Sequence, residues 1–460
     1  MELTPIYQRV IGLDVHQAKI SACALAQQPD GSVLFEQREF GGFKRDRRAL
    51  AQWAREFGAE VVVMESTGIY WRSPYAALES VGIAAWVVNA RHVKTVPGRK
   101  TDVADAQWLA TLARSGLLRG SFIPEAHVRH LRLIARQRQK LGGMLASEKN
   151  RLHKVLCDAG IRLGVVISDV HGQAGRAMIK ALIEGKTLPE VLDLAGRVRA
   201  TRETLFDALQ PEELSEMHRF VLRETMAHIE ELEARMGRFE QALLQGLSAW
   251  QTELTLLQTI PGIDIIGAAM LLVEISTDMQ SFGSAERLAS WVGVCPGNNE
   301  SAGKRKSGKT RKGNAWVRRL LCEFAQAASR SRCALKDKFA ALSIRKGHKK
   351  SIVALAHKIL RIVFAVIKNK TPYLDKVVDY EALSVQRRCT TLVEDVDQAR
   401  LHAHASLILL KLVCSQMRLG QSPVRLCHVC CVVSFTLKVR APSMRPCSCE
   451  TTKEFLTPNS

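Results

Sequence analysis

The N-terminal part of the chain combines short apolar runs with segments of helical spacing. Apolar and β-branched runs, separated by turn residues such as those at 29–31, predict strands. The predicted strands are 10–15, 19–26, 32–40, 60–65 and 83–89. Helical spacing predicts helices at 43–57, from Pro74 onward, and at 102–115. The resulting order, β-β-β-α-β-α-β-α, is typical of an RNase H-like fold, in which helices flank a mixed sheet.

Beyond residue 125 the strand signals end and the spacing becomes helical. Apolar residues then recur at intervals of three and four at Ile229, Leu232, Met236, Phe239 and Leu243. This pattern fits a coiled-coil or dimerisation helix, and it fits an ordinary core helix equally well. We therefore expect an α/β domain followed by all-α parts. The expected parts are the α/β domain at 1–120, a helical linker and candidate oligomerisation region at 121–250, a basic domain at 251–395, and an atypical tail at 396–460.

Charge is unevenly distributed along the chain. The 66 Lys and Arg residues outnumber the 45 Asp and Glu residues, which gives a formal net charge of +21. Residues 1–120 hold 15 basic and 12 acidic residues, whereas residues 251–395 hold 24 and 13. Such an excess predicts a polyanionic partner, because each neutralised phosphate releases counterions. On charge alone, a basic protein with no nucleic-acid role remains the alternative.

No signal for secretion or for a membrane span is apparent in the sequence. Residues 1–8 lack the basic and apolar regions of a secretory signal. The most apolar stretch, 352–367, is interrupted by His357, Lys358 and Arg361. Only six of the twelve cysteines precede residue 400, and they lie far apart, which is typical of reduced thiols. We therefore expect a cytoplasmic protein that does not contact membranes.

The tail differs in composition from the rest of the chain. Its cysteines at 427–431 and 447–449 resemble zinc-ligand spacing. The segment has few acidic residues and irregular periodicity, so an altered or out-of-frame terminus explains it better. We expect the tail to be poorly ordered.

Four carboxylates occupy positions that suit metal chemistry. Asp14 lies in an apolar strand, where a carboxylate is costly unless it is paired or binds metal. Glu65 ends the strand that this topology places next to it, and Asp102 and Asp105 share one face of a helix start. An all-oxygen set of this kind suits one or two Mg²⁺ ions, with Mn²⁺ as a substitute. Taken singly, Asp102 also fits a helix cap and Glu65 a surface acid.

Two further motifs have simpler explanations. Residues 303–310 match the pattern of a phosphate-binding P-loop, but we expect no strand before them, and Arg311–Asn314 would break the helix that must come next. We therefore reject nucleotide binding there. Residues 259–263 resemble the turn of a helix-hairpin-helix, although Pro-Gly also occurs in ordinary turns.

Several motifs together resemble the DEDD transposases of the insertion-sequence one-ten family, which include Piv-type DNA invertases. The N-terminal motifs are Gly-Leu-Asp-Val-His at 12–16, Met-Glu-Ser-Thr-Gly at 64–68 and Lys-Thr-Asp-Val-Ala-Asp-Ala at 100–106. The C-terminal motifs are Trp-Val-Gly-Val-Cys-Pro at 291–296, Asn-Glu-Ser-Ala-Gly-Lys at 299–304 and Lys-Gly-Asn at 312–314. The resemblance covers about residues 8–375 and does not extend into the tail.

This resemblance implies a RuvC-like N-terminal domain, a helical linker and a C-terminal transposase domain with a serine nucleophile. It further implies strand exchange through a phosphoserine link and a structured guide RNA encoded by the element. Ser301 is the position that matches the family's serine. It opens the segment 301–320, which holds eight basic residues and no acidic residue. Ser307 is the competing candidate.

Our interpretation is a magnesium-dependent transposase or site-specific DNA recombinase that works as a homo-oligomer, a dimer or tetramer, at the nucleoid of a prokaryotic cell. Asp14, Glu65, Asp102 and Asp105 would hold the metal, and Ser301 would attack the DNA phosphate. The cations expected to bind the nucleic-acid backbone are Lys304, Arg305, Lys306, Lys309, Arg311 and Lys312. The alternatives are a RuvC-like endonuclease without a covalent intermediate and a non-catalytic nucleic-acid-binding protein.

Overall fold

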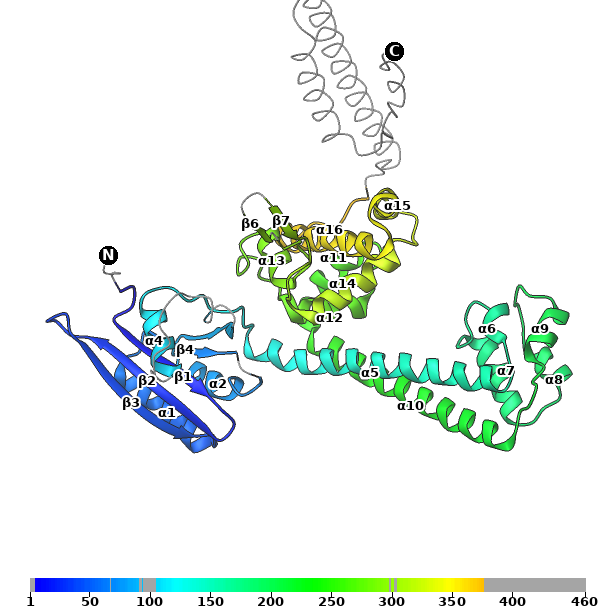
Figure 1. Ribbon diagram of the computed structural model, residues 1–460, viewed down its shortest axis with the longest axis horizontal. Coiled ribbons are helices and arrows are strands. Elements are labelled where there is room, and N and C mark those ends of the chain that lie inside the picture. The colour runs from blue at the N-terminus through cyan, green and yellow to red at the C-terminus, as the bar shows by residue number, and fades with distance from the viewer. Residues whose placement is uncertain are drawn as a thin grey trace, which may run out of the picture. The chain divides into compact units, whose positions relative to one another are not determined.

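The computed structural model describes residues 5–66, 68–90, 93, 105–297, 299–301 and 304–375, with backbone only at 299–301 and 304–307 (Figure 1). All of these residues belong to one compact unit that ends at Lys376. Asp102 and the expected tail at 396–460 lie outside the described residues.

Five strands form the N-terminal sheet. They are β1 (Arg9–Val15), β2 (Lys19–Gln27), β3 (Val33–Gly41), β4 (Val61–Glu65) and β5 (Ala85–Val88). Their order across the sheet is β3-β2-β1-β4-β5, with β1 antiparallel to β2 and parallel to β4. An antiparallel meander extended by parallel strands is the arrangement of an RNase H-like fold, which confirms the sequence prediction for this part of the chain.

Helices cover both faces of this sheet because its strands alternate between two apolar faces. Ile11 and Leu13 of β1 pack in one core with α1 (Lys44–Phe57) and α2 (Arg72–Ser80). Val10 and Val63 point to the opposite face, where they pack under α4 (Asp105–Arg114). The sheet is therefore the middle of three layers.

Glycine at position 12 lets α4 lie directly on β1. A Cβ atom on Gly12 would lie 2.0 Å from the carbonyl oxygen of Ala106 and 2.7 Å from the amide nitrogen of Ala110. At the other end of the helix, the amide of Ile6 donates to the carbonyl of Arg114 at 2.9 Å. Helix α4 thus runs antiparallel to β1, and its first residue lies toward the strand's carboxyl end.

The linker is a pair of long helices with smaller helices at one end. Helix α5 (Ala126–Asp158) packs antiparallel against α10 (Glu216–Gly246). Ion pairs join them along their length, from Arg138–Glu240 at 2.7 Å to Asp158–His218 at 3.2 Å. Four short helices share a separate core with the ends of this pair: α6 (Leu163–Val166), α7 (Gln173–Ile183), α8 (Leu188–Asp193) and α9 (Arg202–Leu209). The apolar stripe on α10 therefore has a partner helix within its own chain.

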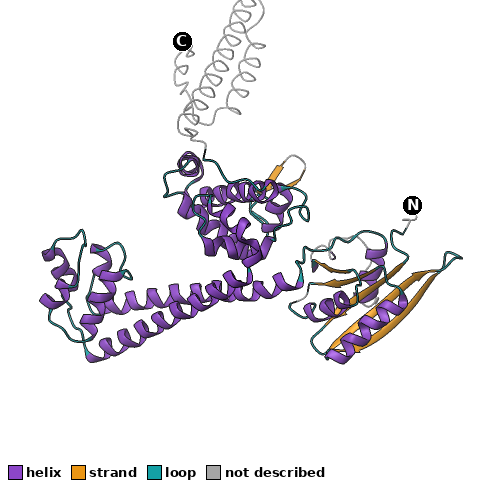
Figure 2. Cartoon of the chain, turned by 180° about the vertical axis from the view of Figure 1, so that it is seen from behind, coloured by secondary structure: helices purple, strands orange, loops and turns teal. Residues whose placement is uncertain are grey.

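The C-terminal part is helical apart from one small hairpin. Its helices are η1 (Ser248–Trp250), α11 (Gln251–Gln258), α12 (Ile265–Ile275), α13 (Ala285–Val292), α14 (Ala315–Ala328), α15 (Ala334–Lys346) and α16 (His348–Asn369). The hairpin is formed by β6 (Asn299–Ser301) and β7 (Lys304–Ser307), and these two strands form a sheet of their own, drawn in orange in Figure 2. Nearly every residue of α12 is buried, so this helix forms the centre of the core.

None of the helices in the described part of the chain has the length and apolar character needed to cross a membrane.

Candidate active site

Two of the predicted metal ligands lie near the carboxyl ends of neighbouring parallel strands. Leu13 of β1 lies opposite Met64 of β4, so Asp14 and Glu65 are the next residues along the two strands. Leu13 and Met64 both point into the core under α1. Because side chains alternate along a strand, Asp14 and Glu65 point to the opposite face, which α4 covers.

Asp105 approaches the same corner of the sheet from the helix above. It is the first residue of α4, and the next residue, Ala106, lies over Gly12. Gly12 precedes Asp14 by two positions and therefore shares its face. The structure thus brings Asp14, Glu65 and Asp105 to one corner, which we call the carboxylate corner. Asp102, the fourth predicted ligand, lies outside the described residues.

The carboxylate corner is open at Asp14. The Asp14 side chain is 33% exposed, and its Oδ2 lies 3.1 Å from Nε2 of His16. Asp14 lies within β1 as expected, between the buried Leu13 and Val15, but its side chain is partly exposed and not enclosed by its apolar neighbours. A partly exposed position leaves this carboxylate accessible to a ligand.

The donor chemistry of this corner fits a hard divalent cation, because carboxylate oxygens are the ligands that Mg²⁺ prefers. Within the described ranges, however, no group of three or more His, Cys, Asp or Glu side chains is arranged closely enough to hold a metal ion. The three carboxylates share a corner without forming a closed ligand set, and the fourth predicted ligand is not among the described residues.

Ser301 is the last residue of the short strand β6. The backbone of Ser301 pairs with Lys304 across the β6–β7 hairpin, and Asn299 pairs with Ser307. The two serine candidates are therefore at opposite ends of one hairpin, with Ser301 at the tip. The expectation that no strand precedes residue 303 was wrong in detail, because β6 is present, but it belongs to a two-stranded hairpin and not to a large sheet.

The segment after the hairpin supports the rejection of a P-loop. Thr310 bridges to Pro296, and the next helix, α14, begins only at Ala315. A P-loop lysine and threonine must open directly into a helix, whereas here Arg311–Asn314 intervene.

Two of the C-terminal motifs pack backbone to backbone and form the base of the hairpin. A Cβ on Gly293 would lie 2.7 Å from the carbonyl oxygen of Arg311, and one on Gly313 would lie 2.4 Å from that of Val292. The amide of Asn314 donates to the carbonyl of Trp291 at 3.2 Å. The segments at 291–296 and 312–314 therefore have a structural role, which is to hold the two ends of the hairpin together.

Asn314 connects this base to the protein core. Its Oδ1 accepts hydrogen bonds from the amides of Trp316 (3.0 Å) and Val317 (3.2 Å), which caps α14. Its Nδ2 donates to Oε2 of Glu274 at 2.9 Å. Glu274 is 2% exposed in α12, so one side chain links a helix start to a buried charge.

Two arginines of α5 neutralise Glu274. Arg136 donates from Nε at 2.7 Å and from its terminal nitrogen at 3.0 Å, and Arg132 lies at 3.6 Å. Burial by itself would raise the pKa of Glu274, but the hydrogen bond from Arg136 and the charges of both arginines hold it below its ordinary value. Burial also lowers the pKa of Arg132 to about 10, against the attraction of Glu274.

Sequence reasoning missed this Glu274 cluster. One signal was present: Glu274 is the only charged residue in the otherwise apolar run 265–275. A buried carboxylate requires a cationic partner, but nothing in the sequence indicated that the partners lie more than 130 residues upstream, at Arg132 and Arg136.

The predicted backbone-binding cations divide into two groups. Lys309, Arg311 and Lys312 are exposed on the segment leading from the hairpin to α14. Arg318 holds this segment through a 3.0 Å hydrogen bond to Oγ1 of Thr310. For Lys304, Arg305 and Lys306 only the backbone of β7 is described, so the direction of these side chains stays a prediction.

The turn at 259–263 joins α11 and α12, as a helical hairpin requires. Gly262 has a φ of 89°, which favours glycine, and a Cβ there would lie 2.5 Å from the carbonyl oxygen of Phe324. The next residue but one, Asp264, caps α12 by accepting from the amide of Gly267 at 2.7 Å. Packing against α14 explains the Pro-Gly pair, and the resemblance to a helix-hairpin-helix stays a prediction.

Comparison with known protein families matches both the N-terminal domain and the C-terminal helical part of the chain. A DEDD transposase model, described as "Transposase", matches residues 11–160, and "Transposase IS116/IS110/IS902 family" matches residues 254–340. An RNase H-like domain followed by this helical domain defines a DNA transposase. The two models together cover more than half of the chain, which belongs to the IS110 family of DEDD transposases.

Relatives of the chain carry names of the same kind. The chain is 25% identical to a "Probable family 20 transposase" of Pseudomonas aeruginosa, over 71% of this chain and 89% of the relative. It is 22% identical to the "Transposase for insertion sequence element IS1111A" of Coxiella burnetii, over 79% and 91%. A "Pilin gene-inverting protein" of Moraxella bovis is 35% identical over 26% of this chain and 38% of the relative.

Among solved structures, the RuvC protein of Thermus thermophilus aligns with 25% of this chain and 99% of its own length, at 14% sequence identity and a TM-score of 0.19.

Proposed function

We propose that this transposase cleaves and rejoins DNA with a metal-binding DEDD cluster of Asp14, Glu65, Asp102 and Asp105. The observation that supports the proposal best is the carboxylate corner, where β1, β4 and α4 each supply an acidic residue. Bound Mg²⁺, or Mn²⁺ in its place, would activate the attacking group and stabilise the leaving oxygen of a phosphodiester. The chain's own contribution is to hold the carboxylates at the ends of rigid elements.

The nucleophile that we propose is Ser301. Its Oγ would form a bond to phosphorus while the bond from phosphorus to the leaving sugar oxygen breaks, and the serine proton would pass to solvent or a base. A serine hydroxyl is a weak nucleophile until a base, a metal or local positive charge activates it. The basic residues after it, from Lys304 to Lys312, support this assignment because they would orient the phosphate.

Membership of the family extends the proposal to the partners. We propose that the protein acts as a homo-oligomer, a dimer or tetramer, at the DNA of a prokaryotic cytoplasm, and that a structured guide RNA directs it. We also propose that divisions at residues 120, 250 and 395 separate four parts: the metal-binding domain, the linker, the serine-bearing domain and the tail. Sequencing of the DNA that flanks the gene tests the guide-RNA proposal, because it would reveal the element's ends and a non-coding region that could encode the RNA.

Mass spectrometry of a denatured, nuclease-trimmed reaction tests the mechanism. We expect a nucleotide adduct on Ser301 and no adduct in Ser301→Ala. An adduct on Ser307 would assign the reaction to the other end of the hairpin. Cleaved DNA with free ends and no adduct would favour the RuvC-like endonuclease, in which water attacks.

A mixing experiment tests whether the two sites work together. Ser301→Ala and Asp14→Asn should each be inactive alone. If active sites are shared between protomers, mixing the two variants restores part of the activity. If DNA cleavage does not require Asp14, the metal-cluster proposal is wrong.

A further inference from the structure

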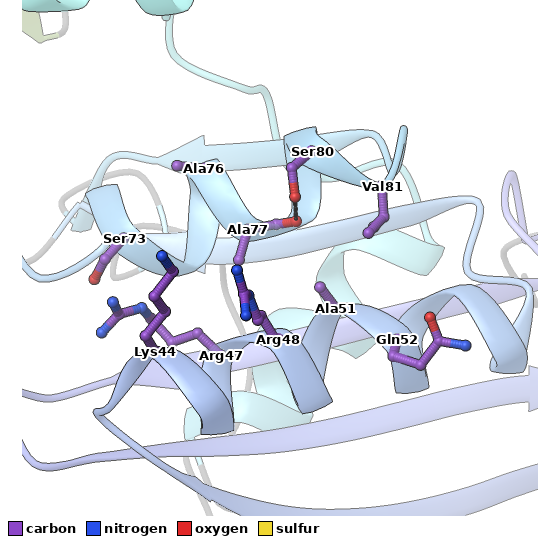
Figure 3. Close-up of a pocket in the computed structure, with 10 residues that line it drawn as sticks. All are labelled: Lys44, Arg47, Arg48, Ala51, Gln52, Ser73, Ala76, Ala77, Ser80 and Val81. Carbon is purple, nitrogen blue, oxygen red and sulfur yellow. Dashed lines mark hydrogen bonds between the residues drawn. The ribbon is translucent and has the colours of Figure 1, made fainter.

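A basic groove lies between α1 and α2, on the sheet face opposite α4. It has a volume of about 660 Å³. Each helix contributes one stripe of residues at spacings of three and four: Lys44, Arg47, Arg48, Ala51 and Gln52 from α1, and Ser73, Ala76, Ala77, Ser80 and the adjoining Val81 from α2 (Figure 3). We call this the α1–α2 groove.

The two walls of the groove differ in chemistry. The α1 wall begins with three cations, and Lys44 and Arg48 extend from it toward α2 (Figure 3). The α2 wall carries only alanine, serine and valine, whose small side chains leave the hollow between the helices. No acidic residue lines either wall. The groove therefore combines space with uncompensated positive charge.

The three cations form no ion pair with any acidic residue in the described part of the chain. Arg47 donates to the carbonyl of Gly42, which holds its guanidinium at the start of the helix. The neighbouring Arg45, by contrast, lies 3.4 Å from Asp46. Cations left without counterions at an exposed groove can bind an anionic ligand.

An exposed aromatic residue lies beside the basic wall. Phe43 immediately precedes Lys44 and is 74% exposed. Aromatic side chains next to cations are typical of surfaces on which unpaired bases stack while the backbone is neutralised.

We propose that the α1–α2 groove binds the phosphodiester backbone of a nucleic acid, at a site separate from the carboxylate corner. The sheet lies between the two sites, because α1 and α2 cover one face and α4 covers the other. The choice of nucleic acid as the ligand rests on the proposed function, and the charge complementarity of the groove supports it independently. The N-terminal domain thus takes part in holding nucleic acid, a task that its near-neutral overall charge does not suggest.

The test is the salt dependence of binding by the full-length protein, measured by fluorescence anisotropy with a duplex DNA and a single-stranded RNA. The slope to be measured is that of the logarithm of the binding constant against the logarithm of the salt concentration. On duplex DNA, Lys44→Gln combined with Arg48→Gln should flatten this slope by about two units, at about 0.9 per lost phosphate contact. The matched control is Arg45→Gln combined with Arg55→Gln, which removes the same charge from exposed positions of α1 outside the groove. An unchanged slope in the first pair, or an equal change in both pairs, would overturn the proposal.

A second variant leaves every cation in place. Ala76→Glu puts a carboxylate into the groove and should weaken binding by about tenfold relative to Ala76→Gln, since like charge repels phosphate. Equal binding by the two would contradict the proposal. Phe43→Ala distinguishes the ligands: weaker binding of the RNA alone indicates an unpaired strand, and unchanged binding of both indicates a duplex.

The same preparations separate this proposal from the proposed function. Asp14→Asn should lose cleavage and keep the wild-type salt slope. If Asp14→Asn cleaves normally while the groove variants lose binding, the metal cluster is wrong and the groove stands. If Asp14→Asn is inactive while the groove variants bind normally, the groove is wrong and the metal cluster stands.

Discussion

The carboxylate corner and the β6–β7 hairpin are held in place by different kinds of contact. The corner is built on a sheet, where the pairing of Leu13 with Met64 fixes the next residue of each strand. The hairpin is built on helices, and its base is held by Gly293, Gly313 and the side chain of Asn314. One site depends on strand register, and the other depends on caps and close backbone packing.

This difference agrees with the ligand that each site is expected to bind. A metal ion requires its ligands at nearly fixed separations, and parallel strand ends supply that rigidity. Cations that track a nucleic-acid backbone can adjust through their long side chains, so a short hairpin is sufficient. Substitutions that act on one site and leave the other intact test whether the two are supported independently.

The largest expected effect is on catalysis at the carboxylate corner. Asp14→Asn, Glu65→Gln, Asp102→Asn and Asp105→Asn should each reduce DNA cleavage by roughly a thousandfold or more, because a neutral amide removes the charge that the metal needs. The assay is cleavage with Mg²⁺, with nucleic-acid binding and thermal melting as measures of integrity. Glu56→Gln, an exposed acid on α1, is the matched control and should cleave normally. Wild-type turnover in two of the four variants would contradict the metal site.

The next effect is on stability at the base of the hairpin. Glu274→Gln leaves Arg132 and Arg136 without their buried counter-charge and should lower the free energy of unfolding by about 3–5 kcal/mol. Chemical denaturation measures the change. Glu240→Gln breaks the half-buried pair with Arg138 and should cost about 1 kcal/mol or less. Equal losses in the two variants would show that burial of Glu274 does not matter.

The pH dependence of stability gives a second test of the role of Glu274. Because the folded state lowers the pKa of Glu274, its ionised form contributes stability above the ordinary carboxyl range, and that contribution is lost as the pH falls through the lowered pKa. Glu274→Gln has no such group, so its stability should fall less steeply on the acid side than that of the wild type. Parallel curves would contradict the assignment.

A smaller effect is expected where α4 lies on β1. Gly12→Ala places a methyl group against the carbonyl of Ala106 and should destabilise the N-terminal domain by roughly 2–3 kcal/mol. It should also lower cleavage, because α4 carries Asp105. Gly237→Ala in α10 meets nothing within 4 Å and should instead stabilise by about 0.5–1 kcal/mol. A neutral Gly12→Ala would mean that α4 can move away without consequence.

At the hairpin, the expected effect is on salt dependence. Replacing Lys304, Arg305 and Lys306 with Ala should flatten the log–log slope for duplex DNA by about two to three units, at about 0.9 per contact. Thermal stability should change little. An unchanged slope would mean that these side chains do not contact phosphate.

The smallest effect is expected from removing the tail. Deletion of residues 400–460 should leave cleavage at the wild-type level, because both proposed sites and α16 precede it. Zinc content is measured in parallel. A deletion variant that loses both bound zinc and activity would show that the cysteines at 427–449 form a real metal module.

The sheet and the pairing of the strands that carry Asp14 and Glu65 were predictable because local patterns determine them. Apolar runs marked β1 and β4 to within one residue, and the order of elements placed the two strands side by side. The predicted helix at 102–115 includes Asp105, which is the first described residue of α4. In each case the information lies within a few residues of the site.

The supports of both sites were not predictable, because they depend on contacts between distant segments. Gly12 matters only because Ala106 lies above it, and Glu274 is tolerated only because α5 supplies arginines. The strand at Ser301 was missed for a related reason: a hairpin of three and four residues carries too little alternation to be recognised.

The bonds of Asn314 fix the base of the hairpin to the protein core. Tilting its base would uncap α14 and strip a hydrogen bond from a buried negative charge at the same time, so that end behaves as a rigid mount. Farther out, the described links are a bridge from Pro296 to Thr310, a 3.0 Å bond from the amide of Gly297 to the carbonyl of Lys309, and the strand pairing of Asn299 with Ser307 and of Ser301 with Lys304. Backbone pairing therefore continues from the base as far as Ser301, so a displacement of the base would carry Ser301 with it.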